Sequence, residues 1–403
     1  MQYDFTTVWN RAGHDSLAVD SVGADNAWAP DQPKEGFDFI PMWVADMGFA
    51  TMPGVVESMR SRLEHPIFGY FEGGTRYTDA ITRWQEHRNG VTDLKPEYIG
   101  YQNSVLGGLA AAMEAVCARG DKVLIHAPTY TGFTNTLTNL GYKLIHSTLK
   151  RDEARVWRMD YEEMEQLLNE NHIHVAVFCS PHNPSGRVWE QWELEKAMEL
   201  FQRYQVTIIS DEIWSDILLN GHTHIPTQQV SEYAKQNTVA LYAPSKTFNL
   251  AGLVGSYHII YNDALRHRVE KVSSLSHYNQ QNLLSMYALL GAYTPEGEQW
   301  VDQLRQTLSH NVNWAYEFIQ QNFKGVTLAK PQGSYLLFLD CSQYCEEKGI
   351  TLSQLIKAGW DVGVGWQDGR PFHGATSIRM NLALPFSQVE TAFQRLKDHV
   401  FVD

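Results

Sequence analysis

The segment VALYAPSKTFNLAGLVGSYHIIY, residues 239–261, contains only one charged side chain, that of Lys246. No other Lys, Arg, Asp or Glu occurs between Gln236 and Asn262, although these residue types make up 19% of the chain. The apolar runs on either side of Lys246 indicate buried strands. One interpretation is a surface lysine that extends from a strand end to water. The other is a buried amine with a lowered pKa, which is suited to Schiff-base chemistry.

Short apolar runs alternate with helical patterns from about residue 100 to residue 260. The runs are continuous rather than strictly alternating, which is typical of strands that are covered on both faces. They occupy residues 122–128, 143–148, 174–181, 206–211, 238–245 and 256–261. Helix candidates such as 161–170 and 189–205 lie between them. We therefore predict an α/β fold with a mostly parallel sheet between helices.

The length of 403 residues exceeds what a single hydrophobic core usually supports, so we expect two domains. After about residue 290 the pattern changes to long amphipathic helices followed by short strand-like pieces, which is typical of an α+β domain. We predict a large domain over residues 51–290 and a smaller C-terminal α+β domain over residues 291–403. Residues 1–50 are expected to wrap around the fold and join the small domain.

Composition excludes several classes of protein. The net charge is −14 and no run of Lys and Arg occurs, which argues against nucleic acid or an anionic membrane as the partner. No apolar run approaches the roughly 18 residues needed to span a bilayer. The N-terminus lacks the basic and apolar regions of a signal peptide. We therefore expect a cytoplasmic protein that acts on a small molecule.

The cysteine and histidine patterns predict neither a disulfide framework nor a metal site. The histidine pairs at 172–174 and 222–224, and the cysteine pair at 341–345, have no further ligands in a metal-binding spacing. Few and scattered cysteines are typical of a reducing compartment. There are four of them: Cys117, Cys179, Cys341 and Cys345.

Polar or aromatic side chains directly follow four of the predicted strands. Asn183, Asp211, Lys246 and Tyr130 each stand at the carboxyl end of an apolar run. Taken singly, each has a plain structural explanation, as a turn residue, a helix cap or a core side chain. Because ligands bind outside the carboxyl ends of parallel strands, the four together predict one binding site.

This set of side chains is the one that pyridoxal phosphate requires. A lysine forms the imine, and a carboxylate pairs with the pyridinium nitrogen and keeps the ring an electron sink. An amide donates to the phenolic oxygen, and an aromatic ring stacks on the cofactor. A helix N-terminus holds the phosphate, and the predicted helix that follows Asn103 and Ser104 provides one.

Six motifs resemble one enzyme family. They are PMWVADMGF (41–49), HPIFGY (65–70), SPHNPSGRVW (180–189), SDEIWSDI (210–217), APSKTFNLAGL (243–253) and SIRMNLALP (377–385). The chain resembles the fold-type I pyridoxal-phosphate enzymes of the class I/II aminotransferase superfamily, and within it the cystathionine β-lyase and C–S lyase branch. The resemblance extends from about residue 35 to the C-terminus.

The resemblance implies a role for each cofactor-binding residue. Lys246 is the Schiff-base lysine, and Asp211 is the partner of the pyridinium nitrogen. Asn183 contacts the ring oxygen and the substrate carboxylate, and Tyr130 stacks on the ring. We add Ser245 and the backbone at Val105 and Leu106 as further phosphate contacts.

Three more residues complete the predicted site. The resemblance implies that Arg379 binds the substrate carboxylate, for which a planar guanidinium fork is suited. Trp43, with the backbone of residues 44–47, is expected to border the substrate pocket. Tyr70 is implied to reach the phosphate of a neighbouring subunit, so we expect a homodimer with shared active sites.

The chain departs from related patterns at three positions. Aspartate aminotransferases carry a tyrosine three residues after the pyridinium aspartate, where this chain has Trp214. They also place an arginine eight residues after the lysine, where this chain has Val254. Gly48 stands where the C–S lyase branch usually has an acidic residue. The first two departures argue against an aspartate aminotransferase, and the third affects the specificity of the pocket.

The resemblance implies α,β-elimination from cystathionine or another cysteine S-conjugate, which yields a thiol, pyruvate and ammonia. An aminotransferase is the alternative, since the same lysine, aspartate and asparagine serve both reactions. A third possibility is a non-catalytic regulatory or binding protein that keeps the fold. The segments 180–189 and 243–253, together with Trp214, favour the lyase.

Overall fold

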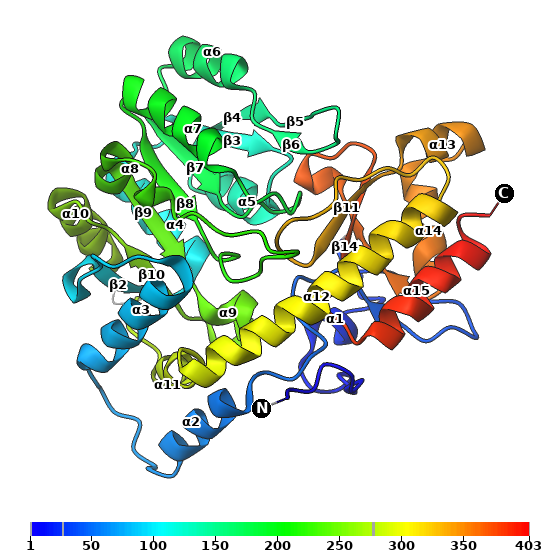
Figure 1. Cartoon of the computed structure of the whole chain (residues 1–403), viewed down its shortest axis with the longest axis horizontal. Helices are drawn as coiled ribbons and strands as arrows, with labels where there is room; N and C mark the ends of the chain where they lie inside the picture. Colours follow the sequence, from blue (N-terminus) through cyan, green and yellow to red (C-terminus); the bar gives the residue numbers. More distant parts are fainter. Residues whose placement is uncertain (1, 26–27, 276–278, 403) are drawn as a thin grey trace.

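A seven-stranded sheet forms the centre of the largest part of the molecule (Figure 1). The computed structural model describes residues 2–25, 28–275 and 279–402. Across the sheet the strands follow the order β2 (Ile99–Gln102), β10 (Ser256–Ile259), β9 (Thr238–Tyr242), β8 (Thr207–Asp211), β7 (Val175–Cys179), β3 (Lys122–Ala127) and β4 (Lys143–Thr148). β10 runs opposite to the other six strands, so it pairs antiparallel with β2 and β9, whereas all other pairs in this sheet are parallel. The predicted α/β class is therefore confirmed.

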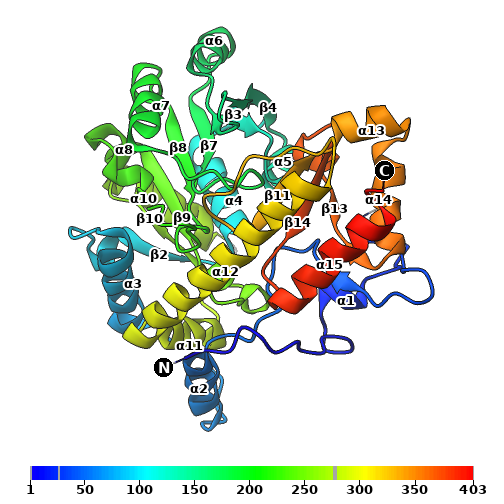
Figure 2. The same ribbon diagram turned by 45° about the vertical axis from the view of Figure 1, so that its right-hand side comes forward.

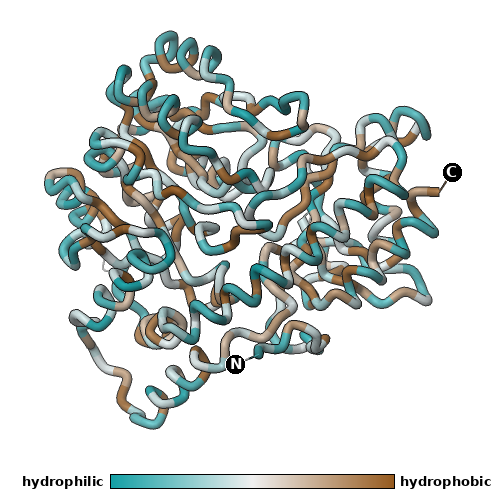
Figure 3. The backbone as a smooth tube through the Cα atoms, viewed as in Figure 1, coloured by the Kyte–Doolittle hydropathy of each residue, from teal (hydrophilic) through white to brown (hydrophobic). Residues whose placement is uncertain are grey.

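Helices cover both faces of this sheet, which explains why its central strands carry apolar side chains on both faces. Val123 and Ile125 belong to the core beneath α4 (Val105–Val116), α5 (Thr131–Asn139) and α10 (Asp263–Ser274). Leu124, between them, points to the other face and packs with α6 (Tyr161–Asn171), α7 (Gln191–Arg203) and α8 (Glu232–Asn237). Figure 3 shows the apolar strands between helices whose outer surfaces are polar.

A second sheet of three antiparallel strands lies beside the first (Figure 2). Its order is β11 (Leu336–Asp340), β14 (Ser377–Asn381) and β13 (Gln367–Asp368). The register places Arg379 of β14 opposite Phe338 on one side and Gln367 on the other. The small sheet therefore places Gln367 directly beside Arg379.

The helix α12 (Pro295–Asn322) connects the two sheets (Figure 2). Trp300, Leu304, Leu308 and Val312 recur every four residues, and all are buried in the core that α12 shares with β11, β14 and α15 (Phe386–His399). Asn311, also buried, donates from Nδ2 to the carbonyls of Leu382 (3.0 Å) and Leu384 (2.9 Å). Because one helix and one core extend over both sheets, the two-domain division at residue 290 stays a prediction.

The segment 40–49 lies between the two sheets and is held by both. Its first residues form β1 (Ile40–Pro41), which pairs in parallel with β12 (Val364–Gly365). Asn381, on the small sheet, donates to the carbonyls of Val44 (2.7 Å) and Asp46 (2.6 Å). Asn249, on the side of the large sheet, donates to the carbonyls of Met47 and Phe49. The segment is therefore fixed where the two sheets face each other.

The remaining elements are short or lie at the periphery. The helices are α1 (Leu17–Asp20), α2 (Pro53–Leu63), α3 (Gly74–Asn89), α9 (Pro244–Thr247), α11 (Leu283–Ala292), α13 (Ser342–Lys348) and α14 (Leu352–Asp361), and a small hairpin consists of β5 (Lys150–Arg151) and β6 (Trp157–Arg158). Single 3₁₀ turns occur at Pro96–Tyr98, Thr227–Gln229, Ala251–Leu253 and Arg370–Phe372. Within the described ranges, none of the helices has the length and apolar character needed to cross a bilayer.

Candidate active site

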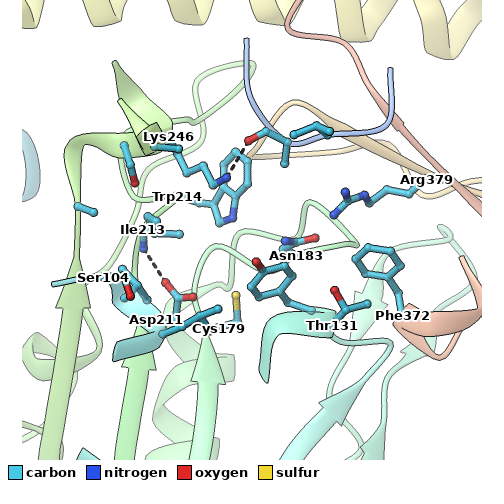
Figure 4. A pocket seen from close by; sticks show the side chains of 18 of the residues that line it. Ser104, Thr131, Cys179, Asn183, Asp211, Ile213, Trp214, Lys246, Phe372 and Arg379 are labelled. Atoms are coloured by element: carbon cyan, nitrogen blue, oxygen red, sulfur yellow. Dashed lines mark hydrogen bonds between the residues drawn. The ribbon is translucent and has the colours of Figure 1, made fainter. Parts of the chain in front are cut away.

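A cavity of about 310 Å³ opens at the carboxyl ends of the parallel strands. It is closed on the other side by β14 and by the segment that contains Val44 and Ala45. Eight of the ten predicted site residues line it: Val105, Leu106, Tyr130, Asn183, Asp211, Ser245, Lys246 and Arg379. Figure 4 shows Lys246 and Arg379 entering the cavity from opposite sides, with Asp211 and Asn183 below them. The structure therefore brings together the amine, the carboxylate, the amide and the guanidinium that the sequence predicts.

Lys246 is a partly buried side chain whose amine forms no ion pair with a carboxylate of the described residues. It lies on α9, the single helical turn that follows β9 and Ala243. Its Nζ donates to the carbonyl of Ala45 (2.7 Å) and lies 5.6 Å from the centre of the Trp214 ring. Burial lowers the pKa of Lys246 to about 8, and the nearby charge of Arg379 acts in the same direction. The lysine is therefore partly a neutral amine near neutral pH, which is the nucleophilic and basic form.

Asp211 is a buried carboxyl at the end of β8. Its Oδ1 accepts a hydrogen bond from the backbone N–H of Ile213 (3.0 Å). Burial raises the pKa of Asp211 to about 7, although the Ile213 N–H and the charge of Lys246 oppose this shift. A buried carboxyl of this kind ionises when a cationic group binds beside it. Asp211 is thus suited to pair with a protonated ring nitrogen in the cavity.

Arg379 and Asn183 keep unused hydrogen-bonding capacity within the cavity. One guanidinium nitrogen of Arg379, Nη2, donates to the carbonyl of Trp43 (2.9 Å) and to Gln367. Its Nε and Nη1, and Oδ1 of Asn183, are buried and have no partner among the described residues. Burial lowers the pKa of Arg379 to about 10, so the group stays charged at neutral pH. The charged guanidinium therefore keeps N–H donors for an anionic group in the cavity, such as a carboxylate.

An anion site adjoins these groups at the start of α4. The hydroxyl of Ser104 caps the helix by accepting from the N–H of Gly107 (2.9 Å), and Val105 and Leu106 follow as the first helical residues. The first backbone N–H groups of a helix have no partner within the helix, and they form the positive end of the helix dipole. They are therefore suited to a phosphate.

Tyr130 presents its ring to the same cavity. It precedes α5, and its position depends on Gly132, where a Cβ would lie 2.3 Å from Cε1 of the tyrosine ring. Burial raises the pKa of Tyr130, so the phenol remains protonated. The glycine thus leaves room for an aromatic ring that can stack on a flat ligand.

The structure places Trp43 outside the cavity lining. Its indole is fully buried and donates from Nε1 to the carbonyl of Ala18 (2.9 Å). Val44 and Ala45, the next two residues, line the cavity instead, and Trp43 contributes its backbone carbonyl to Arg379. Trp43 therefore contacts Arg379 through its backbone carbonyl, and its ring packs edge-on against Trp28, which lines the cavity.

Tyr70 also lies away from this cavity and is fully exposed. It belongs to the segment between α2 and α3, where it lines a separate, open groove with Phe68 and Gln281. Ile67 and Phe68 beside it are exposed apolar side chains. Tyr70 of the same chain thus does not complete the site.

The three departures from related patterns have a visible place in the structure. Trp214 is buried beneath the amine of Lys246. Val254 lines the cavity with a positive φ of 47°, a conformation that β-branched residues rarely adopt. Gly48 packs against Leu384, and a Cβ at Gly48 would lie 2.7 Å from Cδ2 of that leucine. A side chain at position 48 therefore requires Leu384 to move.

Several residues of the cavity were not predicted. Gln367 and Phe372 contact Arg379, the first through a hydrogen bond and the second with its ring centre 4.3 Å from the guanidinium carbon. Their sequence context carries no signal, because β13 has only two residues and Phe372 lies in a 3₁₀ turn. The other unpredicted lining residues include Trp28, Ser104, Thr131, Cys179 and Ile213.

One group of potential metal ligands lies at the opposite, amino-terminal ends of β3 and β7. Within the described residues, Cys117, Asp121 and His174 bring one ligand atom each within 4.8 Å of one another. The cysteine Sγ lies 3.9 Å from Nε2 of His174, which lies 3.6 Å from the Asp121 carboxylate. A thiol–imidazole contact and a surface imidazole–carboxylate contact account for this arrangement.

Comparison with known proteins places these residues in a family context. The family model described as Aminotransferase class I and II matches residues 46–396. The chain is 32% identical over 363 residues to the protein named cystathionine beta-lyase PatB of Bacillus subtilis (strain 168), which covers 89% of this chain and 92% of that protein. A structure of a PLP-bound C-S lyase from Staphylococcus hominis superposes with a TM-score of 0.89 at 28% identity, over 100% of this chain and 99% of that one. A PLP-bound putative aminotransferase from Clostridium difficile 630 superposes with the same TM-score at 31% identity, over 98% and 99% of the two chains.

Proposed function

The chain belongs to the aminotransferase class I and II family, and from this premise we propose that it is a pyridoxal-phosphate-dependent carbon–sulfur β-lyase. Its substrate is cystathionine or another S-conjugate of cysteine. The reaction is an α,β-elimination that cleaves the Cβ–S bond and, with one water molecule, yields a thiol, pyruvate and ammonia. The observation that carries the proposal is the convergence of Lys246, Asp211, Asn183 and Arg379 on one cavity.

The residues of the cavity match the functional groups of pyridoxal phosphate. When bound, this cofactor supplies a carbonyl carbon that links to amines and a pyridinium ring that accepts the electron pair left at the substrate Cα. Lys246 provides the amine for the covalent link, and Asp211 provides the carboxylate for the ring nitrogen. Asn183 provides Nδ2 as the donor for the ring oxygen, and its unpaired Oδ1 can accept a hydrogen bond from a ligand. Tyr130 provides a face for the ring, and the start of α4 with Ser245 provides donors for the phosphate.

The remaining steps are performed by side chains of this chain. The charged guanidinium of Arg379, which keeps unpaired N–H donors, binds the substrate α-carboxylate and orients its Cα toward Lys246. The neutral amine of Lys246 then takes the Cα proton, for which a pKa of about 8 is suited. Trp214 and Phe372 form apolar walls that exclude water from this region. The same lysine, once protonated, is positioned to return a proton.

Two observations favour elimination over amino transfer. Trp214 stands where aspartate aminotransferases carry a tyrosine, and it presents an apolar ring under the lysine instead of a tyrosine hydroxyl from that position. The curated relative in Bacillus subtilis and the superposed structure from Staphylococcus hominis carry lyase names. An aminotransferase is the second candidate, because the superposed Clostridium difficile structure carries that name and the same residues serve both reactions.

The two candidates differ in their need for a second substrate. Holoenzyme is incubated with L-cystathionine in the absence of any keto acid, with the Lys246→Ala protein as the blank. Sustained release of pyruvate, ammonia and thiol supports the lyase. Turnover that starts only after a keto acid is added identifies an aminotransferase and contradicts the proposal.

We also propose that two chains form the functional unit. The exposed groove of Phe68 and Tyr70, with Ile67 beside it, leaves apolar side chains on the surface. A second copy of the chain covers such a patch, and a two-fold dimer is the commonest arrangement. Tyr70 then reaches the phosphate in the partner's cavity, since it does not reach the one in its own chain.

A further inference from the structure

The carbonyl oxygen of Ala45 accepts two hydrogen bonds at once. One comes from Nζ of Lys246 (2.7 Å), and the other comes from the hydroxyl of Tyr335 (3.0 Å). We propose that Tyr335 is a positioning residue, which holds the Ala45 carbonyl and through it the amine of Lys246 for proton transfer at the substrate Cα. This inference rests on the proposed function in so far as Lys246 is the base.

Tyr335 supports the lysine from a second direction as well. It directly precedes β11 and is fully buried. Its ring packs edge-on against Trp214, with ring centres 4.8 Å apart and planes inclined by 76°. The Trp214 ring in turn lies 5.6 Å from Nζ of Lys246. Tyr335 therefore contacts both the Ala45 carbonyl, which accepts from the amine, and the Trp214 ring, which lies beneath the amine.

The Ala45 carbonyl is a fixed point, because the flanking carbonyls are held too. Arg379 donates to the carbonyl of Trp43 (2.9 Å). Asn381 donates to the carbonyls of Val44 (2.7 Å) and Asp46 (2.6 Å). Four consecutive carbonyls are thus each bonded to a side chain. Among these four carbonyls, that of Ala45 accepts from two different side chains, the proposed base Lys246 and Tyr335.

The sharing of one oxygen has a consequence for the charge state of Lys246. A carbonyl acceptor stabilises the ammonium form more than the neutral amine, since hydrogen bonds from charged donors are stronger. The Tyr335 hydroxyl competes for the same oxygen and weakens that stabilisation. The charged groups that act on Lys246 are Arg379, Asp46 and Asp211, and none of them is changed when Tyr335 is replaced. Removal of the hydroxyl should therefore favour the ammonium.

The Tyr335→Phe variant tests this role, because it removes the hydroxyl and keeps the ring on Trp214. Tyr344→Phe is the matched control: Tyr344 is also buried and donates to a backbone carbonyl, that of Val400 (2.6 Å), away from the cavity. The first measurement is the exchange of the substrate Cα proton for deuterium in D₂O, followed by NMR on the holoenzyme. This exchange precedes both elimination and amino transfer, so it does not depend on which reaction follows.

We expect Tyr335→Phe to slow the exchange on the order of tenfold, because a base that is less well oriented transfers protons more slowly. The substrate concentration for half-maximal exchange should stay within about twofold of wild type, since Arg379 is unchanged. Tyr344→Phe should exchange at the wild-type rate. Equal rates for Tyr335→Phe and Tyr344→Phe would overturn the proposal.

The second measurement uses the chain without cofactor. The rate at which acetic anhydride labels Lys246 is followed by mass spectrometry as a function of pH, which gives the midpoint of its titration. Tyr335→Phe should move this midpoint upward by about half a pH unit, and Tyr344→Phe should not. An unchanged midpoint contradicts the sharing of the Ala45 oxygen. If wild-type protein exchanges the Cα proton but releases no thiol, the lyase proposal fails while the role of Tyr335 is still decided by these two measurements.

Discussion

Replacement of Asp211 by asparagine separates what this residue contributes to function from what it costs in stability. The amide has the same shape as the carboxyl and keeps an oxygen for the N–H of Ile213. It cannot ionise, so it loses the charge that would pair with a protonated ring nitrogen. We expect Asp211→Asn to be nearly inactive, and yet to be more stable than wild type above neutral pH when the cofactor is absent.

The magnitude follows from the pKa of the buried carboxyl. Burial raises the pKa of Asp211 from 3.8 to about 7, which disfavours the charged form by about 4 kcal/mol. In the unfolded chain the carboxyl releases its proton near pH 4, whereas in the folded chain it keeps the proton until about pH 7. The unfolded state therefore binds fewer protons between these values, and the free energy of unfolding of wild type falls as pH rises. Above pH 7 the free energy of unfolding of wild type stops falling for this reason. In Asp211→Asn the side chain does not titrate, so this decrease does not occur.

The assay is urea unfolding of the cofactor-free proteins at pH 5, 6, 7 and 8 and at one fixed protein concentration. The stability advantage of Asp211→Asn should increase from pH 5 to pH 7 and then stay constant. Asp398→Asn, which removes an exposed carboxylate on α15, is the control and should follow wild type within about 0.5 kcal/mol at every pH. With cofactor, the kcat of Asp211→Asn should fall about 10²–10³-fold, as for other electrostatic catalytic contacts.

Two results would refute this reasoning. Parallel pH dependence of unfolding in wild type and Asp211→Asn would show that burial does not raise the pKa of this carboxyl. Near-native turnover by Asp211→Asn would show that its charge does not act on the cofactor.

Three further predictions concern the other side chains of the cavity. Lys246→Ala should form no borohydride-reducible link to pyridoxal phosphate and should not exchange the substrate Cα proton; a reducible link in this variant, detected by mass spectrometry, would exclude Lys246 as the anchor. Arg379→Lys should raise the KM for an S-conjugate about tenfold or more, because an ammonium cannot replace the planar guanidinium and its unpaired N–H donors. The absorption of the bound cofactor should stay unchanged. An unaltered KM would show that another group binds the substrate carboxylate. Mixtures of inactive Lys246→Ala and Tyr70→Ala chains should regain part of the wild-type activity through hybrid dimers. Subunit exchange is measured with tagged chains. If the chains exchange and activity does not recover, each site is built from one chain.

Most of the central sheet could be predicted from the sequence because its physical signal is local. A strand covered on both faces needs an apolar side chain at every position, and this produces continuous runs such as residues 174–181 and 206–211. The strand β2 (Ile99–Gln102) escaped prediction because its four residues include Gly100 and Gln102 and form no continuous apolar run.

Some residues of the cavity could likewise be predicted from their position after a strand, whereas others depend on how the two sheets pack. Asn183, Asp211 and Lys246 each follow a strand of a parallel sheet, and the carboxyl ends of parallel strands necessarily meet at one edge. The sequence alone therefore determined their grouping, and with it the class of cofactor. Which side chains face them from across the cavity depends on how the small sheet packs against the large one.

That packing decided the contacts that no local pattern encodes. Ala45 and Lys246 are 201 residues apart, and Ala45 and Tyr335 are 290 residues apart, yet both pairs form hydrogen bonds. The Trp43 side chain donates to the carbonyl of Ala18, and Val44 and Ala45 line the cavity in its place. Periodicity and strand ends are properties of neighbouring residues, so a single sequence displays them. Contacts across an interface depend on the shapes of two assembled surfaces, and these exist only after the chain has folded.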